Sequence, residues 1–425
     1  MKKLLQSKRR GSAIPLALVT VLILLAMGTG LLKLGLNSRI FSIRTTSDIT
    51  ARCAADAGLT MALFRMNEKK QQVGLWDGST LPQAIGEKLP HCDSTYSYTV
   101  TGDLTNGYSV KSVGRADRAQ RTVSATLKLK GLFEYAILTK ETLILKSDTL
   151  IDGYNSEDPL DTDVEVDIST KSTADSSIIL NSGVIVEGDV TVGLGGDPDT
   201  VIQDLGATTG DKLSGTVEEP LPQITPPALP DMGVDIAAKG ETITIGPADS
   251  GQYGSIIIRK SDSAVGQMVV SGGDVVLHLT GDIDLGESCE LIVRDGSSLT
   301  VYIDGDIHCR ANCAINSEYP PEDPSKFQIY GTSTTQQFFD IKAKSNWSGV
   351  IYAPNADVIL YAEGDFYGST VCNNFELKSG GNYYYDEALR KVSIEDEGVR
   401  FVIKRWYEGD HKSMNDVSIV QESVY

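Results

Sequence analysis

A long uncharged stretch near the N-terminus limits what this chain can fold into. Ser12–Leu32 contains 21 residues without a charge, and eleven of them are Leu, Ile or Val. A helix of that length crosses the roughly 30 Å hydrocarbon core of a bilayer. Each aliphatic residue favours insertion by about 0.3–0.6 kcal/mol at the helix centre, so together they favour it by roughly 3–6 kcal/mol. The stretch predicts one membrane-spanning helix.

The charges beside this stretch predict its orientation. Met1–Arg10 contains five cations and no acid, and such a basic flank stays on the cytoplasmic side of a membrane. We therefore predict a single-pass membrane protein whose C-terminal part is exported. No clean A-x-A cleavage pattern follows the apolar run. Apolar and small residues keep helical spacing from Ala51 to Met66, so the helix is expected to cover residues 12–72 as a transmembrane and spine helix.

Two short motifs flank the membrane stretch. Lys8-Arg9-Arg10-Gly11-Ser12 is a basic leader that ends in Gly directly before the apolar helix, and Ala54–Leu59 reads Ala-Ala-Asp-Ala-Gly-Leu. The first resembles the class III leader of type IV prepilins, and the second is similar to the A-A-E-A-G-L signature of PilX-type minor pilins. The resemblance implies that a prepilin peptidase cuts between Gly11 and Ser12 and removes residues 1–11. It also implies that the partners are other pilin-like subunits of a type IV pilus or a related secretion filament. The resemblance places the protein in a bacterial inner membrane, with its C-terminal domain exported to the periplasm or to a cell-surface filament.

The chain departs from that family at one residue. Pilins that build the shaft have Glu at mature position five, and that position is Leu16 here. In the family this Glu pairs with the amine of a neighbouring subunit, and tip subunits of the general secretion K type lack it. The resemblance therefore implies a minor pilin with a tip or priming role, which displays its head for assembly or adhesion.

Residues 73–131 change to the alternating pattern that is typical of β-strands. Tyr96–Val100, Tyr108–Val110 and Thr122–Leu127 each alternate along the chain. Asn106-Gly107 lies between the first two runs, and it is a hairpin signal because both residues tolerate positive φ. We predict a small three-stranded antiparallel meander.

Residues 132–390 contain short β-branched runs that are separated by Gly and Asp. Leu277–Leu291 recurs as Val301–Ile315, a shift of 24 residues. A period of 20 to 30 residues with short strands is typical of a solenoid whose coils stack. The predicted fold class is therefore mainly β: a long N-terminal membrane-spanning α-helix, a small antiparallel meander and a parallel β-helix domain. Residues 391–425 are expected to be a C-terminal tail.

One segment interrupts the predicted β-helix. Residues 218–233 contain five prolines and cannot form a central strand. The segment is either an exposed connector between two parts of the β-helix or a strap along its side. Gly349–Val358 and Tyr384–Leu389 are similar to a bacterial β-helical domain found behind PilX-type N-termini, and loosely similar to the polymer-forming bactofilins. That resemblance carries no catalytic residue to transfer.

The charge of the chain excludes one class of partner. The formal net charge is -19, and without the five cations of the leader it is -19 - 5 = -24. An acidic surface of this kind repels phosphate backbones, so no nucleic acid is expected to bind.

Three cysteines follow Gly-Asp turns at the same interval. Cys289, Cys313 and Cys372 each lie seven residues after the Asp of such a turn, so they would share one position of the β-helix if the coils are in register. Adjacent coils stack about 4.8 Å apart, which lies within the roughly 4.4–6.8 Å between Cα atoms that a disulfide allows. The cysteines therefore form either a disulfide or a ladder of reduced thiols that fill the core.

No metal, other cofactor or catalytic residue is predicted. His308-Cys309-x3-Cys313, completed by Cys289 or His278, shows only one loose pair where structural zinc sites show two. The acids between Asp158 and Asp167 lie at alternate positions, as in calcium loops, but alternation also places them on one exposed face of a strand.

The main alternative is a membrane-anchored surface β-helix protein that acts on or binds polysaccharide, with a surface glycan as its partner. Clustered carboxylates could supply such chemistry, namely those of Asp282, Asp284, Asp304 and Asp306. Because Gly-Asp recurs along the coils, its Asp, here Asp282 and Asp306, is better explained as a turn residue. No G-x-S-x-G elbow, Walker loop or HExxH appears, and we predict that the protein is not an enzyme. Tyr383, Tyr384 and Tyr385 either stack on sugars or close the open end of the solenoid.

Overall fold

The computed structural model describes residues 13–72, 76–158, 160, 164, 166–216, 218, 221–316, 323–361, 364–378, 380–394 and 396–409. The chain divides into two compact units. Unit 1 comprises Met1–Lys128 and Val402–Ser423, and unit 2 comprises Leu129–Phe401 and the last two residues. The chain therefore leaves unit 1, builds unit 2, and returns to unit 1.

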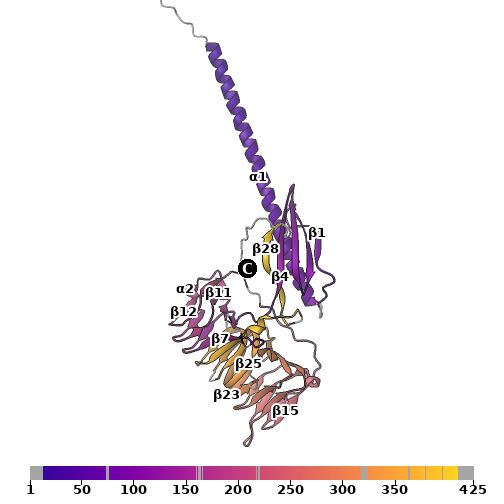
Figure 1. Ribbon diagram of the computed structural model, residues 1–425, viewed down its shortest axis with the longest axis vertical. Helices are drawn as coiled ribbons and strands as arrows, with labels where there is room; N and C mark the ends of the chain where they lie inside the picture. Colours follow the sequence, from indigo (N-terminus) through magenta and orange to yellow (C-terminus); the bar gives the residue numbers. More distant parts are fainter. Residues whose placement is uncertain are drawn as a thin grey trace, which may run out of the picture. The chain divides into compact units, whose positions relative to one another are not determined.

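Unit 1 consists of one long helix and a five-stranded sheet (Figure 1). The helix is α1 (Ala13–Gln72). The strands, in spatial order, are β1 (Gln83–Lys88), β2 (Thr95–Asp103), β3 (Gly107–Ala116), β4 (Ala119–Lys130) and β28 (Arg400–Glu408). The predicted meander is confirmed: β2, β3 and β4 pair antiparallel. Residues 104–106 form the turn of the predicted hairpin, and Asp103 pairs with Gly107, whose φ is 78°. Sequence analysis missed β1, which pairs antiparallel with β2, and β28, which lies within the expected tail.

The N-terminal half of α1 matches the predicted membrane helix. Its side chains from Ile14 to Leu36 are exposed. In the part of the chain that the structure describes, α1 is the one helix that is long and apolar enough to cross a bilayer, and none of its most apolar window is buried. The long apolar N-terminal helix is therefore confirmed.

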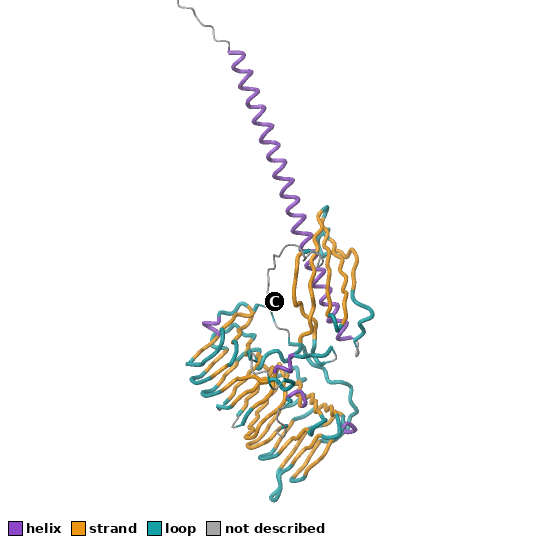
Figure 2. The backbone as a smooth tube through the Cα atoms, in the orientation of Figure 1, coloured by secondary structure: helices purple, strands orange, loops and turns teal. Residues whose placement is uncertain are grey.

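Unit 2 is a parallel β-helix, as predicted, in which three stacks of parallel strands surround one hydrophobic core (Figure 2). Stack A contains, in spatial order, β14 (Ile236–Lys239), β17 (Ile256–Arg259), β20 (Ile283–Leu285), β23 (Ile307–Ile315), β25 (Gln337–Leu360), β26 (Phe366–Leu377), β6 (Leu143–Leu145), β9 (Ile178–Leu180) and β12 (Ile202–Asp204). Stack B contains β15 (Thr242–Ile245), β18 (Gln267–Val270), β21 (Glu290–Val293), parts of β23, β25 and β26, then β27 (Asn382–Asp386), β7 (Leu150–Tyr154) and β10 (Ile185–Val186). Stack C contains β16 (Gly251–Tyr253), β19 (Asp274–Leu279), β22 (Ser298–Ile303), β24 (Phe327–Gly331), parts of β25 and β26, then β5 (Ile137–Thr139), β8 (Ile168–Thr170), β11 (Val190–Leu194) and β13 (Lys212–Gly215).

Four short helices complete the described elements of unit 2. They are α2 (Pro198–Val201), η1 (Pro247–Asp249), η2 (Pro324–Lys326) and η3 (Glu387–Arg390). The predicted 24-residue repeat is also confirmed, because Leu277 pairs with Val301 and Leu291 pairs with Ile315 in the next coil.

The coils do not stack in the order of the sequence. β26 pairs with β5 and β6, and β27 pairs with β7, so the last coil along the chain lies against the first. The chain starts in the middle of the solenoid and builds outward to β13. It then crosses to the opposite end, at β14, and returns coil by coil to the middle. In Figure 1 the labels of β12 and β15 lie toward opposite ends of unit 2, with β7 and β25 between them.

The Pro-rich segment makes this crossing, and the structure shows it to be a strap along the side. Ile224 is buried against the outer side of stack C, in a small cluster with Tyr302, Tyr330 and Tyr352. The Tyr352 hydroxyl donates to the carbonyl oxygen of Pro222 at 2.8 Å, and the Gln223 side chain donates to that of Thr332 at 2.9 Å. The strap therefore covers apolar side chains that a solenoid face would otherwise expose.

Candidate functional sites

The Ala-Ala-Asp-Ala-Gly-Leu motif packs α1 against the sheet of unit 1. Ala54, Ala55 and Leu59 are buried. A Cβ on Gly58 would lie 2.4 Å from Oγ of Ser112. On the facing strand β3, a Cβ on Gly114 would lie 2.0 Å from the carbonyl oxygen of Ala51. The motif thus supplies the small residues that let the helix approach the strands closely.

The Asp of the motif lies beside the last strand of unit 1. Asp56 interacts with the Trp406 side chain of β28 and with Arg52, one turn earlier on α1. The Arg52 guanidinium lies 5.6 Å from the centroid of the Trp406 ring, and its Nη2 lies 3.7 Å from Oε2 of Glu408. These four side chains join the returning strand to the helix. Sequence analysis missed the strand because residues 391–425 contain no repeat or turn signal that relates them to residues 83–130.

The side of α1 opposite the motif points away from the sheet and carries an exposed stripe. Ile49, Cys53, Thr60 and Phe64 are exposed, and successive members are separated by intervals that return to one side of a helix. The side chains of Ile49 and Phe64 are 59% and 56% exposed. This stripe continues the exposed apolar surface of the membrane half toward the C-terminal end of α1.

The predicted processing site lies outside the described residues. Gly11 and Ser12 both belong to the N-terminal residues that the structure does not describe. Leu16, at the position where shaft pilins have Glu, is 73% exposed on α1.

The structure brings together two of the three predicted cysteines. Cys289 and Cys313 lie in successive coils, and the backbone N–H of Ala314 donates to the carbonyl oxygen of Cys289 at 3.2 Å. Cys372 lies elsewhere, in stack C, where it pairs with Ala353 and Thr139. The difference arises because Gly-Asp turns occur at more than one corner of the coil: Asp282 precedes a strand of stack A, whereas Asp365 precedes the stack B part of β26.

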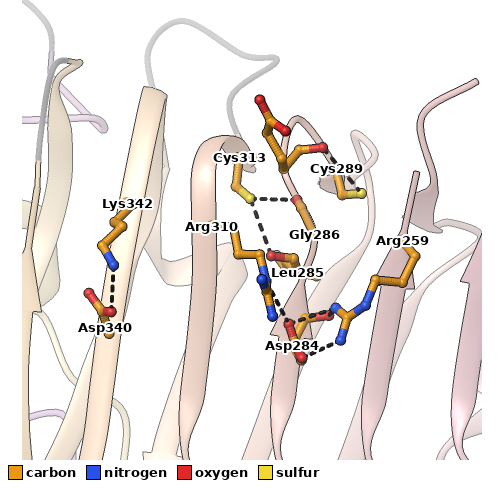
Figure 3. Close-up of polar contacts among 10 residues, drawn as sticks. Arg259, Asp284, Leu285, Gly286, Cys289, Arg310, Cys313, Asp340 and Lys342 are labelled. Atoms are coloured by element: carbon orange, nitrogen blue, oxygen red, sulfur yellow. Dashed lines mark hydrogen bonds and ion pairs between the residues drawn. The ribbon is translucent and has the colours of Figure 1, made fainter. Parts of the chain in front are cut away.

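All six cysteines are free thiols in the structure. Cys313 donates to the carbonyl oxygen of Gly286 at 3.0 Å (Figure 3). Burial raises the pKa of the Cys313 thiol to about 12 and also raises that of Cys289. Because the thiolate is the reactive form of cysteine, both side chains serve as small core residues at neutral pH.

The Gly-Asp turns form hydrogen-bonded ladders between coils. A carboxylate oxygen of Asp282 accepts the backbone N–H of Asp306 at 2.8 Å, and one of Asp306 accepts that of Phe338 at 2.8 Å. An equivalent ladder forms at another corner. There Asp167, which follows Val166 and not a Gly, accepts the N–H of Asp189 at 3.2 Å, and Asp189 accepts that of Asp211 at 2.7 Å. The Asp residues of these turns therefore join one coil to the next.

The remaining two acids of the proposed carboxylate cluster are also engaged. Asp284 pairs with Arg259, which holds the pKa of that carboxyl below its ordinary value. Asp304 accepts from the Thr332 hydroxyl at 2.6 Å and lies 3.2 Å from Nε2 of His278. A general acid at neutral pH needs a raised pKa, so the observed environment of Asp284 does not suit that role.

The tyrosine run lies within the solenoid. Tyr383 and Tyr385 are fully buried, and the Tyr383 hydroxyl contacts the carbonyl oxygen of Ala136 and Oγ1 of Thr370, each at 3.0 Å. Tyr384 stacks on Tyr367 with ring centroids 5.0 Å apart. One of the two expectations was that the run closes the open end of the solenoid. It does not, because β27 lies between β26 and β7.

No metal centre is found in the parts of the chain that the structure describes. None of the groups of His, Cys, Asp and Glu there brings three members close enough to hold an ion. Cys309 is buried whereas the adjacent His308 is exposed, because successive residues of a strand face opposite sides. Of the proposed calcium run, Asp161, Asp163 and Glu165 lie outside the described residues.

Two hollows lie on the outer side of stack C. One, of about 490 Å³, is lined by hydroxyl side chains with Asp167, Asp189, Lys171 and Tyr135. The other, of about 620 Å³, is lined by Tyr302, Tyr330 and several acids that include Asp386. Asp386 is buried and accepts three hydrogen bonds, from the N–H and the hydroxyl of Ser156 and from the N–H of Ala388.

Comparison with known proteins gives limited similarity. Residues 240–392, which lie within unit 2, match the family described as "Domain of unknown function (DUF7305)". No curated protein matches the chain. Among solved structures, the chain is similar to the competence-associated pilin ComZ from Thermus thermophilus, with 13% sequence identity and a TM-score of 0.21 over 86% of this chain and 98% of that chain. A TM-score of that size does not establish a shared fold.

Proposed function

We propose that this protein is a minor pilin-like subunit of a type IV pilus or a related secretion filament. In this role α1 anchors the subunit in the inner membrane, the chain beyond it is exported, and the β-helix of unit 2 is the displayed head. The main observation in support of the proposal is the Ala54–Leu59 motif, whose small residues let α1 pack closely against the sheet of unit 1. The basic leader that ends at Gly11 supports it from the sequence.

The role is structural, with assembly or adhesion as its purpose, and no catalytic step. The absence of Glu at position 16 supports a place at or near the tip, because shaft subunits of the resembled family use that carboxylate for polymerisation. The alternative, a surface protein that acts on polysaccharide, has less support, because the four clustered Asp residues are engaged in turns or in ion pairs.

Mass spectrometry of the mature N-terminus tests the processing step. We expect a mature chain that begins at Ser12. We expect the Gly11→Val variant to keep its leader, because its cleavage site lacks the Gly after which the peptidase cuts. A mature chain that begins beyond Ala26 would indicate signal-peptidase cleavage and contradict the proposal.

Photocrosslinking tests whether the exposed stripe of α1 is the surface that packs against other subunits. A photoreactive phenylalanine analogue at Phe64 lies on the exposed stripe of α1, whereas the same analogue at Ile85, which is 87% exposed on β1, serves as the matched control. We expect adducts with a second pilin-like subunit from position 64 and few from position 85. Equal adducts from both positions, or none from position 64, would contradict packing through α1.

A further inference from the structure

One row of side chains on the outer side of stack A is cationic along most of the solenoid. Each member follows the last inward residue of its strand, so the side chains occupy equivalent positions in their coils. We call this set the cationic row; it consists of Arg259, Arg310, Lys342, Lys378 and Lys146, in spatial order. Their side chains are 35%, 65%, 43%, 34% and 42% exposed, respectively.

Gly286 takes the equivalent position in the coil between Arg259 and Arg310, and Tyr361 takes it between Lys342 and Lys378. Lys239, which pairs with Arg259, extends the row by one coil.

The acids beside the cationic row are fewer than its cations. Asp284 pairs with both Arg259 and Arg310 (Figure 3). Farther along, Asp340 lies 2.8 Å from Nζ of Lys342.

Glu376 is likewise shared, at 3.1 Å from Nζ of Lys378 and 3.4 Å from that of Lys146. Among the residues that the structure describes, these five cations therefore pair with three carboxylates, which leaves 5 - 3 = 2 positive charges.

Coil stacking does not account for this surplus. Exposed ion pairs contribute only about 0–1 kcal/mol each, and one cation for each acid would give the same benefit. Arg310 lies one coil from Lys342, and Lys378 lies one coil from Lys146. Adjacent coils are about 4.8 Å apart, so the mutual repulsion of these cations opposes stacking. The chain outside its leader has a net charge of -24, but the two surplus cations are gathered in one row. This row is therefore a local positive stripe that suits a narrow, negatively charged ligand.

We propose that the cationic row binds a linear acidic polysaccharide that carries one carboxylate per sugar residue. The chain would run along the solenoid axis, so that successive carboxylates meet successive coils, whose spacing is comparable to the length of one sugar residue. Tyr361 occupies the row between two of its lysines, with Nζ of Lys342 5.1 Å and Nζ of Lys378 5.8 Å from its ring centroid. Its hydroxyl adds a hydrogen-bonding group among the cations.

The geometry favours a single glycan chain over duplex DNA. B-form DNA carries one charge per roughly 1.7 Å of its axis, which is far denser than one cation per coil. A duplex is also wide enough to cover the Asp ladder of Asp282 and Asp306, which precedes the same strands of stack A. A narrow polyuronate chain avoids these carboxylates.

Binding of three polymers to the full-length protein in detergent micelles tests this proposal independently of filament assembly. The probes are polygalacturonate, neutral dextran and duplex DNA, each at low and at physiological salt. We expect salt-sensitive binding of polygalacturonate and none of dextran. The double variant Arg310→Gln with Lys342→Gln should weaken that binding by roughly tenfold.

Matched variants separate recognition from folding and from net charge. Lys88→Gln with Lys128→Gln removes two exposed cations of unit 1 and should leave binding unchanged. Arg310→Lys keeps the charge and should also bind. The proposal is overturned if the wild type does not bind polygalacturonate, if the row variant binds as well as the wild type, or if duplex DNA binds as tightly as polygalacturonate.

Discussion

At the scale of single residues, glycines decide how closely α1 approaches its sheet. A Cβ on Gly114 would meet three backbone atoms of α1, at 2.0 Å from Ala51, 2.4 Å from Ala55 and 2.9 Å from Ala54. Backbone atoms within a helix cannot move aside individually, so any side chain there must separate the helix from β3. Gly58 on α1, which lies against Ser112 and Tyr96, and Gly114 on β3 are thus both required by lack of space.

We predict that Gly114→Ala destabilises unit 1 by about 1–3 kcal/mol, the usual cost of overpacking. Gly78→Ala is the matched control, because the nearest atoms to its added Cβ lie at an ordinary 3.5 Å. Thermal unfolding of both variants in detergent measures the difference. Equal stability of the two variants would show that the contact between α1 and β3 is looser than the structure indicates.

The buried carboxyl of Asp386 leads us to predict that the stability of unit 2 depends on pH. Burial raises the pKa of its carboxyl above the ordinary value of 3.8, so the folded state favours the protonated form. Its contribution to stability is therefore greatest below pH 3.8 and is lost as the pH rises through the raised pKa. We expect Asp386→Asn, which keeps the shape, to become more stable relative to the wild type as the pH rises from 3 to 7.

Chemical unfolding at several pH values measures this difference. Asp175→Asn is the control, because Asp175 is exposed. A wild-type advantage over Asp386→Asn that grows with pH would reverse the assigned sign.

At the scale of elements, stacked aromatic rings join the coils at the middle of the solenoid. Trp347, Phe366 and Tyr383 occupy the inward position of stack B in three successive coils. Their ring centroids are 5.5 Å and 4.6 Å apart, with the ring planes nearly parallel. Tyr383 then reaches the first coil along the chain through its bond to Ala136. This column therefore lies where the two ends of the β-helix sequence meet.

We predict that Tyr383→Phe lowers the stability of unit 2 by roughly 1 kcal/mol, because it removes two buried hydrogen bonds and little packing. Tyr384→Phe changes the adjacent, partly exposed ring and should cost less than about 0.5 kcal/mol. Denaturant unfolding distinguishes the two. An effect of Tyr384→Phe as large as that of Tyr383→Phe would contradict the importance of the contact with Ala136.

At the scale of the whole molecule, unit 2 is an insertion between two neighbouring strands of unit 1. β4 and β28 lie side by side in the sheet. The N–H of Gly409, after β28, donates to the carbonyl oxygen of Thr122, near the start of β4, at 2.8 Å. The start of β28 therefore lies toward the end of β4, and the chain leaves and re-enters unit 1 at the same edge.

We predict that unit 1 folds without its insertion. Replacing residues 131–399 with a short Gly-Ser linker should leave a cooperatively unfolding sheet, as measured by circular dichroism and amide exchange in detergent. A matched deletion of residues 131–409 also removes Trp406 and Glu408, the partners of Arg52 and Asp56, and should be clearly less stable. If neither deletion folds, unit 1 depends on unit 2.

The sequence alone determined those features that rest on local patterns. The apolar run of α1, the Asn106-Gly107 hairpin and the 24-residue repeat were all predictable, because each arises from neighbouring residues or from a fixed interval along the chain. The pairing of Leu277 with Val301 follows directly from such an interval. The sequence could not show whether the Pro-rich segment is a strap or a connector, because prolines exclude a strand without indicating which residues cover Ile224.

Only the tertiary structure decided which distant segments meet. β28 pairs with β4 although all of unit 2 lies between them in the sequence. The last coil pairs with the first through Cys372 and Thr139. Neither contact has a periodic signal, because the residues involved are more than 200 positions apart and each side is an ordinary β-strand. Counting from Gly-Asp turns misplaced Cys372 for the same reason: the turn looks alike at every corner, and the corner is chosen by the coils that stack around it.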